Sequence, residues 1–145
     1  MAEKKHILVA EDEEKMRQAV EFILQWKGYT VSAAKNGREA LNIIIDSKGN
    51  KRPVDLLITD MQMPQMDGLE LIDEIRKSGA AMPVIAMTGN RDVTIRYSLM
   101  EKDFSHCLFK PFGKDELLNS INAAIEERDG NKKAPKKTYK EKKYS

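Results

Sequence analysis

Five short apolar runs, separated by longer segments with helical spacing, constrain the fold of this 145-residue chain more than any other feature. The runs are continuous rather than alternating, which is typical of strands buried on both faces in a parallel sheet. They comprise residues His6–Ala10, Tyr29–Ala33, Val54–Thr59, Pro83–Thr88 and Cys107–Phe109. The order is therefore a strand followed by a helix five times over, with right-handed crossovers between parallel strands.

The segments between the runs carry helix patterns and helix ends. Apolar residues recur at helical spacing from Met16 to Leu24, and Gly28 is placed to end that helix. Residues suited to cap helix N-termini are Asn36 with Glu39, Asp67 with Glu70, and Asn90 before a segment from Arg91 to about Lys102. The sequence thus predicts an α/β fold, a doubly wound five-stranded parallel sheet of the flavodoxin-like (βα)5 type, with strand order 2-1-3-4-5.

The charge distribution divides the chain into a domain, residues 1–128, and a basic tail, residues 129–145. Residues 132–145 hold seven lysines and one glutamate with little apolar content, so this segment cannot form a core of its own. The tail is expected to be flexible and solvated. The alternative is that its lysines bind nucleic acid or an anionic membrane surface by releasing counterions.

Several classes of protein are excluded by composition. Cys107 is the single cysteine, so an intramolecular disulfide cannot form, and the two histidines lack the ligand spacing of a zinc site. No apolar run approaches the roughly 18 residues that span a bilayer, and acidic residues follow the first run at once, unlike a secretory signal. A cytoplasmic location is expected.

Polar residues follow four of the predicted strands. Ligands of an open parallel sheet bind beyond the carboxyl ends of the strands where the strand order reverses, here between the first and third strands. The residues at those ends are Glu11-Asp12-Glu13, Thr59-Asp60, Thr88-Gly89 and Lys110-Pro111. Each group alone has an ordinary interpretation as a cap or turn, but their joint placement favours a site.

The chemistry that this combination suits is phosphoryl transfer. Neighbouring carboxylates repel one another, and a hard divalent cation such as Mg²⁺ offsets the repulsion. A carboxylate such as Asp60 is a competent nucleophile that forms an aspartyl phosphate. Lys110 offers a positive charge and Thr88 a hydroxyl for the phosphoryl oxygens.

The motif LLITDMQMPQMDG (Leu56–Gly68) resembles the phosphoacceptor loop of the receiver domain of two-component response regulators. ILVAEDE near the start is similar to the acidic pocket of that family, and VIAMTGN and FKPFGKDEL are similar to its Thr and Lys-Pro elements. The resemblance covers roughly residues 5–127. Because the chain ends soon after the fifth predicted helix, a stand-alone receiver of the chemotaxis-regulator (CheY-like) type is expected.

The resemblance implies a role for each site residue. Asp60 would be the phosphoacceptor, and Mg²⁺ would be bound by Asp12 and Asp60, by Glu11 through water, and by the Gln62 carbonyl. Lys110, joined to Pro111 by a cis peptide bond, would pair with the phosphoryl oxygens, and Thr88 would move to hydrogen-bond them. Pro64 and Gly68 would shape the acceptor loop. Residues flanking the phosphorylation site would be Gln62, Gly89 and Asn90.

The resemblance also implies partners and a mode of action. A sensor histidine kinase or a histidine phosphotransfer protein would donate the phosphoryl group, docking near the start of the first helix. The output would be altered protein–protein contacts on the face formed by the fourth helix, fifth strand and fifth helix, where Tyr97, Leu99 and Met100 are candidates. The protein would not be an enzyme, apart from catalysing its own phosphorylation and dephosphorylation.

The chain departs from the family at Cys107, where the switch that works with Thr88 commonly has an aromatic residue. Cys107 is expected to pack as a small buried hydrophobe, and Trp26 is expected to be partly buried. With the aromatic switch missing, the hypothesis is that the signal rests on movement of the loop from Gly89 to Arg91.

Three alternatives remain at this stage. A phosphorylation-independent adaptor of the same fold is one, and a relay whose basic tail binds nucleic acid is another. A hydrolase with an Asp nucleophile is the third, but such phosphatases need a second Asp where this chain has Gln62. A flavin-phosphate site is excluded, because the acidic loop after the first strand would repel the phosphate.

Overall fold

The computed structural model describes residues 4–49, 52–89, 101 and 104–130. Within them, five parallel strands form one sheet in the order β2-β1-β3-β4-β5, which confirms the predicted topology. The strands are β1 (His6–Ala10), β2 (Thr30–Ala34), β3 (Leu56–Asp60), β4 (Val84–Thr88) and β5 (His106–Phe109). The helices are α1 (Glu14–Lys27), α2 (Gly37–Ser47), α3 (Gly68–Lys77) and α5 (Lys114–Gly130).

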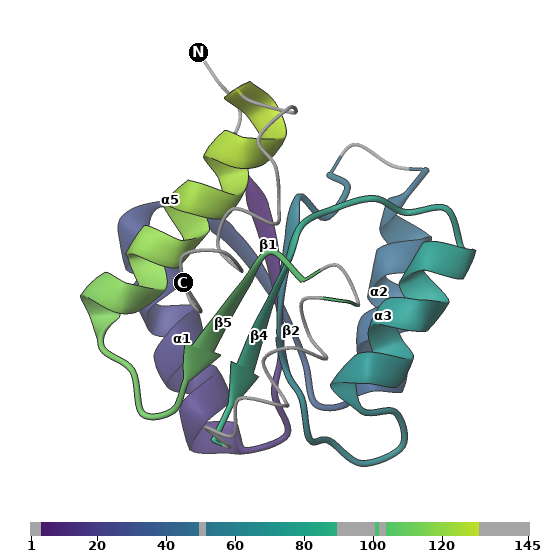
Figure 1. The fold of residues 1–145 in the computed structure, drawn as a ribbon, viewed down its shortest axis with the longest axis horizontal. Coiled ribbons are helices and arrows are strands. Elements are labelled where there is room, and N and C mark those ends of the chain that lie inside the picture. Colours follow the sequence, from purple (N-terminus) through teal and green to yellow (C-terminus); the bar gives the residue numbers. More distant parts are fainter. Residues whose placement is uncertain (1–3, 50–51, 90–100, 102–103, 131–145) are drawn as a thin grey trace.

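The sheet is covered on both faces, by α1 and α5 on one side and by α2 and α3 on the other (Figure 1). Successive residues of β1 pack into opposite layers. Ile7 and Val9 belong to the cluster that includes Leu24 of α1, whereas Leu8 belongs to the cluster that includes Ile72 of α3. Because both faces are buried, the middle positions of the central strands are apolar, and polar residues such as His6, Asp60 and Thr88 lie at the strand ends. This explains the continuous apolar runs in the sequence.

Helix ends follow the predicted signals closely, with one difference. Gly28 ends α1 with a φ of 109°, a conformation that suits glycine. Asp67 and Glu70 form a complete capping box at the start of α3. Asn36 caps α2 by accepting the N–H of Glu39, but the Glu39 carboxylate accepts the N–H of Lys35 instead of that of Asn36.

Strand boundaries shift by one or two residues from the apolar runs, and one shift matters for the site. β3 begins at Leu56 and includes Asp60, whose Cα pairs with that of Met87 in β4. Asp60 is therefore the last residue of a central strand, held by the ladder on one side. The expected helix after Asn90 lies almost wholly outside the described residues.

None of the helices that the structure describes has the length and apolar content needed to cross a bilayer. The predicted domain boundary after residue 128 falls within α5, which continues to Gly130. Residues 131–145 of the predicted basic tail lie outside the described residues.

Gly37, the first residue of α2, allows a close approach between this helix and the loop after β3. A Cβ at Gly37 would collide with the backbone oxygen of Met66. Helix propensity alone favours alanine there by about 1 kcal/mol. We expect the steric cost to exceed this gain, so that Gly37→Ala lowers the free energy of unfolding in urea by about 1–3 kcal/mol.

Gly49→Ala is the matched control, since a Cβ at Gly49 meets no atom within 4 Å. Its free energy of unfolding should stay within about 0.5 kcal/mol of the wild type. A Gly37→Ala protein as stable as the Gly49→Ala protein would show that the approach of α2 to Met66 is not tight.

Candidate functional site

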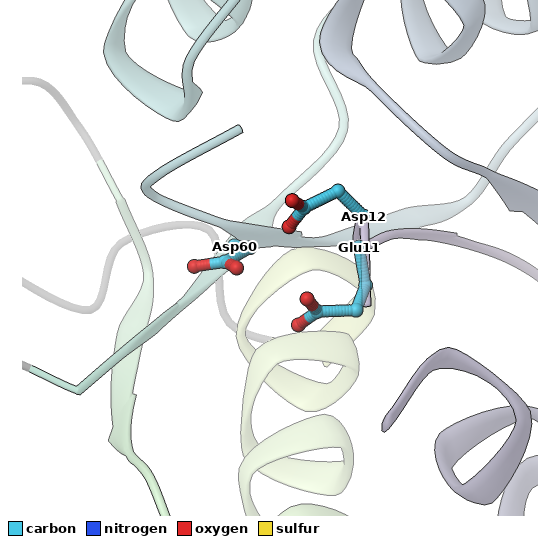
Figure 2. A group of neighbouring side chains, drawn as sticks. All are labelled: Glu11, Asp12 and Asp60. Atoms are coloured by element: carbon cyan, nitrogen blue, oxygen red, sulfur yellow. The ribbon is translucent and has the colours of Figure 1, made fainter. Parts of the chain in front are cut away.

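Three carboxylates from two neighbouring strands meet at the carboxyl edge of the sheet (Figure 2). Glu11 and Asp12 follow β1, and Asp60 ends β3. One oxygen of each lies within 4.8 Å of an oxygen of the others. Glu11 and Asp60 are buried, whereas Asp12 is exposed, so the cluster faces solvent through Asp12. This is the position where the strand order reverses and where ligands of such sheets bind.

Lys110 joins the two buried carboxylates. Its Nζ donates to Glu11 Oε1 at 2.9 Å and to Asp60 Oδ2 at 3.1 Å. The backbone of Lys110 is held as well, because its N–H donates to the Thr88 carbonyl at 2.8 Å. Its peptide bond to Pro111 is cis. The end of β5 is thus tied to the end of β4, and the ammonium group reaches β1 and β3.

The two carboxylates also control the ionisation of Lys110. Burial lowers the pKa of Lys110, but the hydrogen bonds to Glu11 and Asp60 outweigh this effect and raise the pKa above 10.5. The raised pKa means that the folded state holds the proton more tightly than the unfolded chain. The stabilisation is therefore fully present below about pH 10.5 and is lost as the pH rises through the folded-state pKa.

Glu11 carries an electrostatic cost. Burial raises the pKa of Glu11 above 4.5, and nearby Asp60 adds to the rise, while Lys110 and the Glu13 N–H oppose it. The folded state therefore retains the Glu11 proton to a higher pH than the unfolded chain does. Stability falls as the pH rises from about 4.5 to the raised pKa of Glu11. At neutral pH the ionised Glu11 carboxylate therefore carries a cost that a bound cation would relieve.

The loop that presents Glu11 and Asp12 is held by several hydrogen bonds. The Glu11 N–H donates to Ala34 O at 3.0 Å, and Arg17 Nη1 donates to the Glu11 carbonyl at 3.0 Å. The Glu13 N–H donates to Glu11 Oε2 at 3.1 Å. Glu13 precedes α1 without making a side-chain cap bond, so a capping role does not account for this acidic loop. Arg17 lies near the start of α1, where docking of the phosphoryl donor was expected, but its contact with this loop was not foreseen.

The loop after Asp60 contains a tight turn and a close backbone approach. The Gln62 N–H donates to Asp60 Oδ1 at 3.2 Å, and Gln62 itself is exposed. Gln65 has a φ of 70°, and the next N–H donates to Pro64 O, which is the geometry of a γ-turn. At Gly68 a Cβ would lie 2.9 Å from the Asp60 carbonyl oxygen, so only glycine fits. Pro64 and Gly68 lie in this loop as expected, whereas the strained residue, Gln65, was not foreseen.

The remaining predicted residues surround this edge. Thr88 is buried at the end of β4 and Gly89 is exposed after it. Asn90 and Arg91 lie outside the described residues, so the loop-movement hypothesis stays a prediction. Cys107 is half-buried in β5, packed against the core cluster on the α2–α3 side, together with the buried ring of Phe104.

The outer face of α1 differs from the prediction. Trp26 is 63% exposed, so the expectation that it is partly buried is wrong. Leu24 and Val20 occupy the inner face of α1, and the helical period turns Trp26 away from them. Phe22, one turn earlier, is also exposed, and Lys114 Nζ lies 4.8 Å from the centre of the indole ring. The face of the fourth helix with Tyr97, Leu99 and Met100 lies outside the described residues.

The donor set suits a hard divalent cation. Both carboxylate oxygens of Glu11 accept hydrogen bonds, from Lys110 and from the Glu13 N–H. In the described part of the chain, by contrast, the Asp12 carboxylate has no hydrogen-bond or ion-pair partner. An exposed carboxylate beside a buried one is an arrangement that Mg²⁺ favours, since this ion keeps several of its waters.

Proteins of known family resemble this chain in sequence and in fold. The family model described as the response regulator receiver domain matches residues 7–122. The response regulator MprA of Mycolicibacterium vanbaalenii is 34% identical over 119 residues, which cover 82% of this chain and 49% of the relative. The chain thus spans about half the length of the curated relatives it matches.

Solved structures agree with the family match. A response regulator receiver domain protein from Clostridium thermocellum is 32% identical, with a TM-score of 0.77 covering 86% of this chain and 96% of that one. The chemotaxis protein CheY4 of Vibrio cholerae is 27% identical, with a TM-score of 0.77 covering 84% and 99%. The chain belongs to the receiver domain family of two-component response regulators.

Proposed function

We propose that this receiver domain accepts a phosphoryl group on Asp60 with the help of Mg²⁺ and signals through altered protein contacts. The observation that carries the proposal is the cluster of Glu11, Asp12 and Asp60 with Lys110 bonded to two of its members. A carboxylate at the end of a central strand, beside two further carboxylates and a lysine, suits nucleophilic attack on phosphorus.

The proposed step forms one bond and breaks one bond. A carboxylate oxygen of Asp60 attacks phosphorus as the bond from phosphorus to the donor atom breaks, and that electron pair leaves with the donor. Lys110 Nζ, 3.1 Å from Asp60 Oδ2, is placed to pair with a phosphoryl oxygen. The Thr88 hydroxyl is the proposed second partner of the phosphoryl group.

Asp12 and Asp60 would hold Mg²⁺ directly, Glu11 through water, and the Gln62 carbonyl would complete the site. When bound, Mg²⁺ supplies positive charge that offsets the charge on the phosphoryl oxygens. The buried Glu11 keeps Lys110 in place, because it accepts a hydrogen bond from the ammonium group.

The proposed donor is a sensor histidine kinase or a histidine phosphotransfer protein, as is general for receiver domains. The output target, a role as a single-domain regulator, and a cytoplasmic location stay predictions. On this proposal the protein is not an enzyme with a separate substrate, and it catalyses only its own phosphorylation and dephosphorylation. Nucleic-acid binding by the tail stays an alternative that concerns residues outside the described ranges.

Treatment with acetyl phosphate and Mg²⁺ tests the proposal directly. We expect a hydroxylamine-sensitive phosphoryl adduct by intact mass in the wild type, and none in Asp60→Asn or with the metal removed. The matched control is Asp73→Asn, which removes an exposed carboxylate on α3 and should leave the adduct unchanged. If a folded wild type that binds Mg²⁺ formed no adduct, a phosphorylation-independent adaptor would become the better proposal.

Substitution of Asp12 separates two properties of the carboxylate cluster, its internal repulsion and its proposed binding of Mg²⁺. Asp12→Asn relieves repulsion between carboxylates within 4.8 Å, so the metal-free variant should be more stable than the wild type, by at most about 1 kcal/mol given solvent screening. Mg²⁺ at about 100 times its Kd should stabilise the wild type by about 2.7 kcal/mol, and the variant much less. Urea unfolding with and without Mg²⁺ measures both effects, and equal stabilisation of both proteins by Mg²⁺ would contradict this role for Asp12.

Gln62 lies where it can orient or block a water that attacks the phosphorylated Asp60. Its N–H donates to Asp60 Oδ1, and the residue is exposed. We expect Gln62→Ala to change the first-order rate of dephosphorylation without preventing phosphorylation, because the backbone N–H is retained. The decay of the adduct after removal of acetyl phosphate gives this rate, and an unchanged rate would show that the Gln62 side chain is inert.

A further inference from the structure

Arg17 is the one charged side chain of α1 that the structure ties to the backbone of the acidic loop. It is half-buried, and its Nη1 donates to the carbonyl oxygen of Glu11 at 3.0 Å. The backbone N–H of Arg17 donates to Glu13 O at 2.9 Å, so the same residue contacts both ends of the loop. No step of the proposed phosphoryl transfer uses Arg17.

The Glu11 carbonyl affects the orientation of Asp12, because it lies in the same peptide plane as the N–H of Asp12. A hydrogen bond to that oxygen, together with the bond from the Glu11 N–H to Ala34 O, fixes the backbone on both sides of Glu11. The orientation of the plane sets the direction in which the Asp12 side chain leaves the chain. Asp12 has no bond of its own in the described residues that would hold its carboxylate toward Asp60.

We propose that Arg17 is a positioning residue for the cation site, and that it holds the Glu11–Asp12 peptide so that the Asp12 carboxylate faces Asp60. The inference rests on the proposed function, since it concerns the Mg²⁺ site of that function. Groups one contact removed from metal ligands commonly change metal affinity by 10–100-fold when they are removed.

If Arg17 acts through its charge, its removal should change the affinity for Mg²⁺ in one direction, and if it acts by positioning Asp12, in the other. A guanidinium group bonded beside an acidic pocket repels an incoming cation, so removal of its charge alone would tighten Mg²⁺ binding. Loss of the bond to the Glu11 carbonyl would free the Asp12 peptide and weaken binding. The sign of the change in affinity therefore separates the two roles.

Calorimetric titration of the whole chain with Mg²⁺ measures this sign. We expect Arg17→Ala to raise the Kd for Mg²⁺ by about 10-fold. Arg17→Lys keeps a donor on a long stem and should recover most of the affinity. Arg17→Gln, which is neutral and keeps part of the stem, serves if the alanine variant does not fold, and it should also bind more weakly than the wild type.

Arg128→Ala is the matched control. Arg128 Nη1 donates to the Asp55 carbonyl at 2.9 Å, which is also an arginine-to-backbone bond. Asp55 precedes β3, so this bond lies at the amino end of the strands, away from the carboxylate cluster. A general loss of stability would follow from either substitution, but Mg²⁺ affinity should change only at Arg17. In the metal-free protein, the amide resonance of Asp12 should likewise shift in Arg17→Ala and not in Arg128→Ala.

The outcomes are distinct. If the wild type binds Mg²⁺ and Arg17→Ala binds it equally well or more tightly, the positioning role is refuted while the proposed function stands. If Arg128→Ala weakens Mg²⁺ binding as much as Arg17→Ala does, the effect is one of stability alone and the inference is also refuted. If the wild type binds no Mg²⁺, both the proposed function and this inference are refuted.

Discussion

The hydrogen bonds of Lys110 to Glu11 and Asp60 are the interaction on which the site depends. Buried carboxylates at the ends of β1 and β3 repel each other, and burial raises the pKa of Glu11. One ammonium group bonded to both offsets this repulsion and brings three strand ends together. Glu11 still carries part of the cost of burial, and groups with perturbed pKa values of this kind cluster at functional sites.

The fold provides the place for this arrangement through a simple constraint. Parallel strands that are buried on both faces carry their carboxylates at or beyond their ends, as Asp60 and Glu11 do here. The reversal of strand order between β1 and β3 opens space beside those ends. Asp60 is held by pairing with β4 and by the close approach of Gly68 to its carbonyl oxygen. The proposed nucleophile, Asp60, is therefore part of the sheet, whereas Asp12 lies on a loop whose backbone is bonded by Arg17.

Local sequence patterns predicted local structure well, because the interactions involved are themselves local. Gly28 and the Asp67–Glu70 capping box act within a few residues, so their pattern and their geometry coincide. The pattern was less reliable where a side chain has two nearby partners, as for Glu39, which bonds Lys35 instead of Asn36. Burial was misjudged for Trp26, since an aromatic residue on a helix gives no sign of whether another element covers it.

By itself, the sequence determined the parallel sheet, its strand order, and the set of strand ends that carry charge, since these follow from apolar runs and from the rules of crossover connections. Only the tertiary structure decided which of those charges touch. The bonds from Lys110 to Glu11 and Asp60 join residues 99 and 50 positions apart, and the bond from Arg17 to the Glu11 carbonyl has no sequence signature. Such contacts depend on side-chain direction and on the exact ends of strands, which are properties of the packed chain and not of any local pattern.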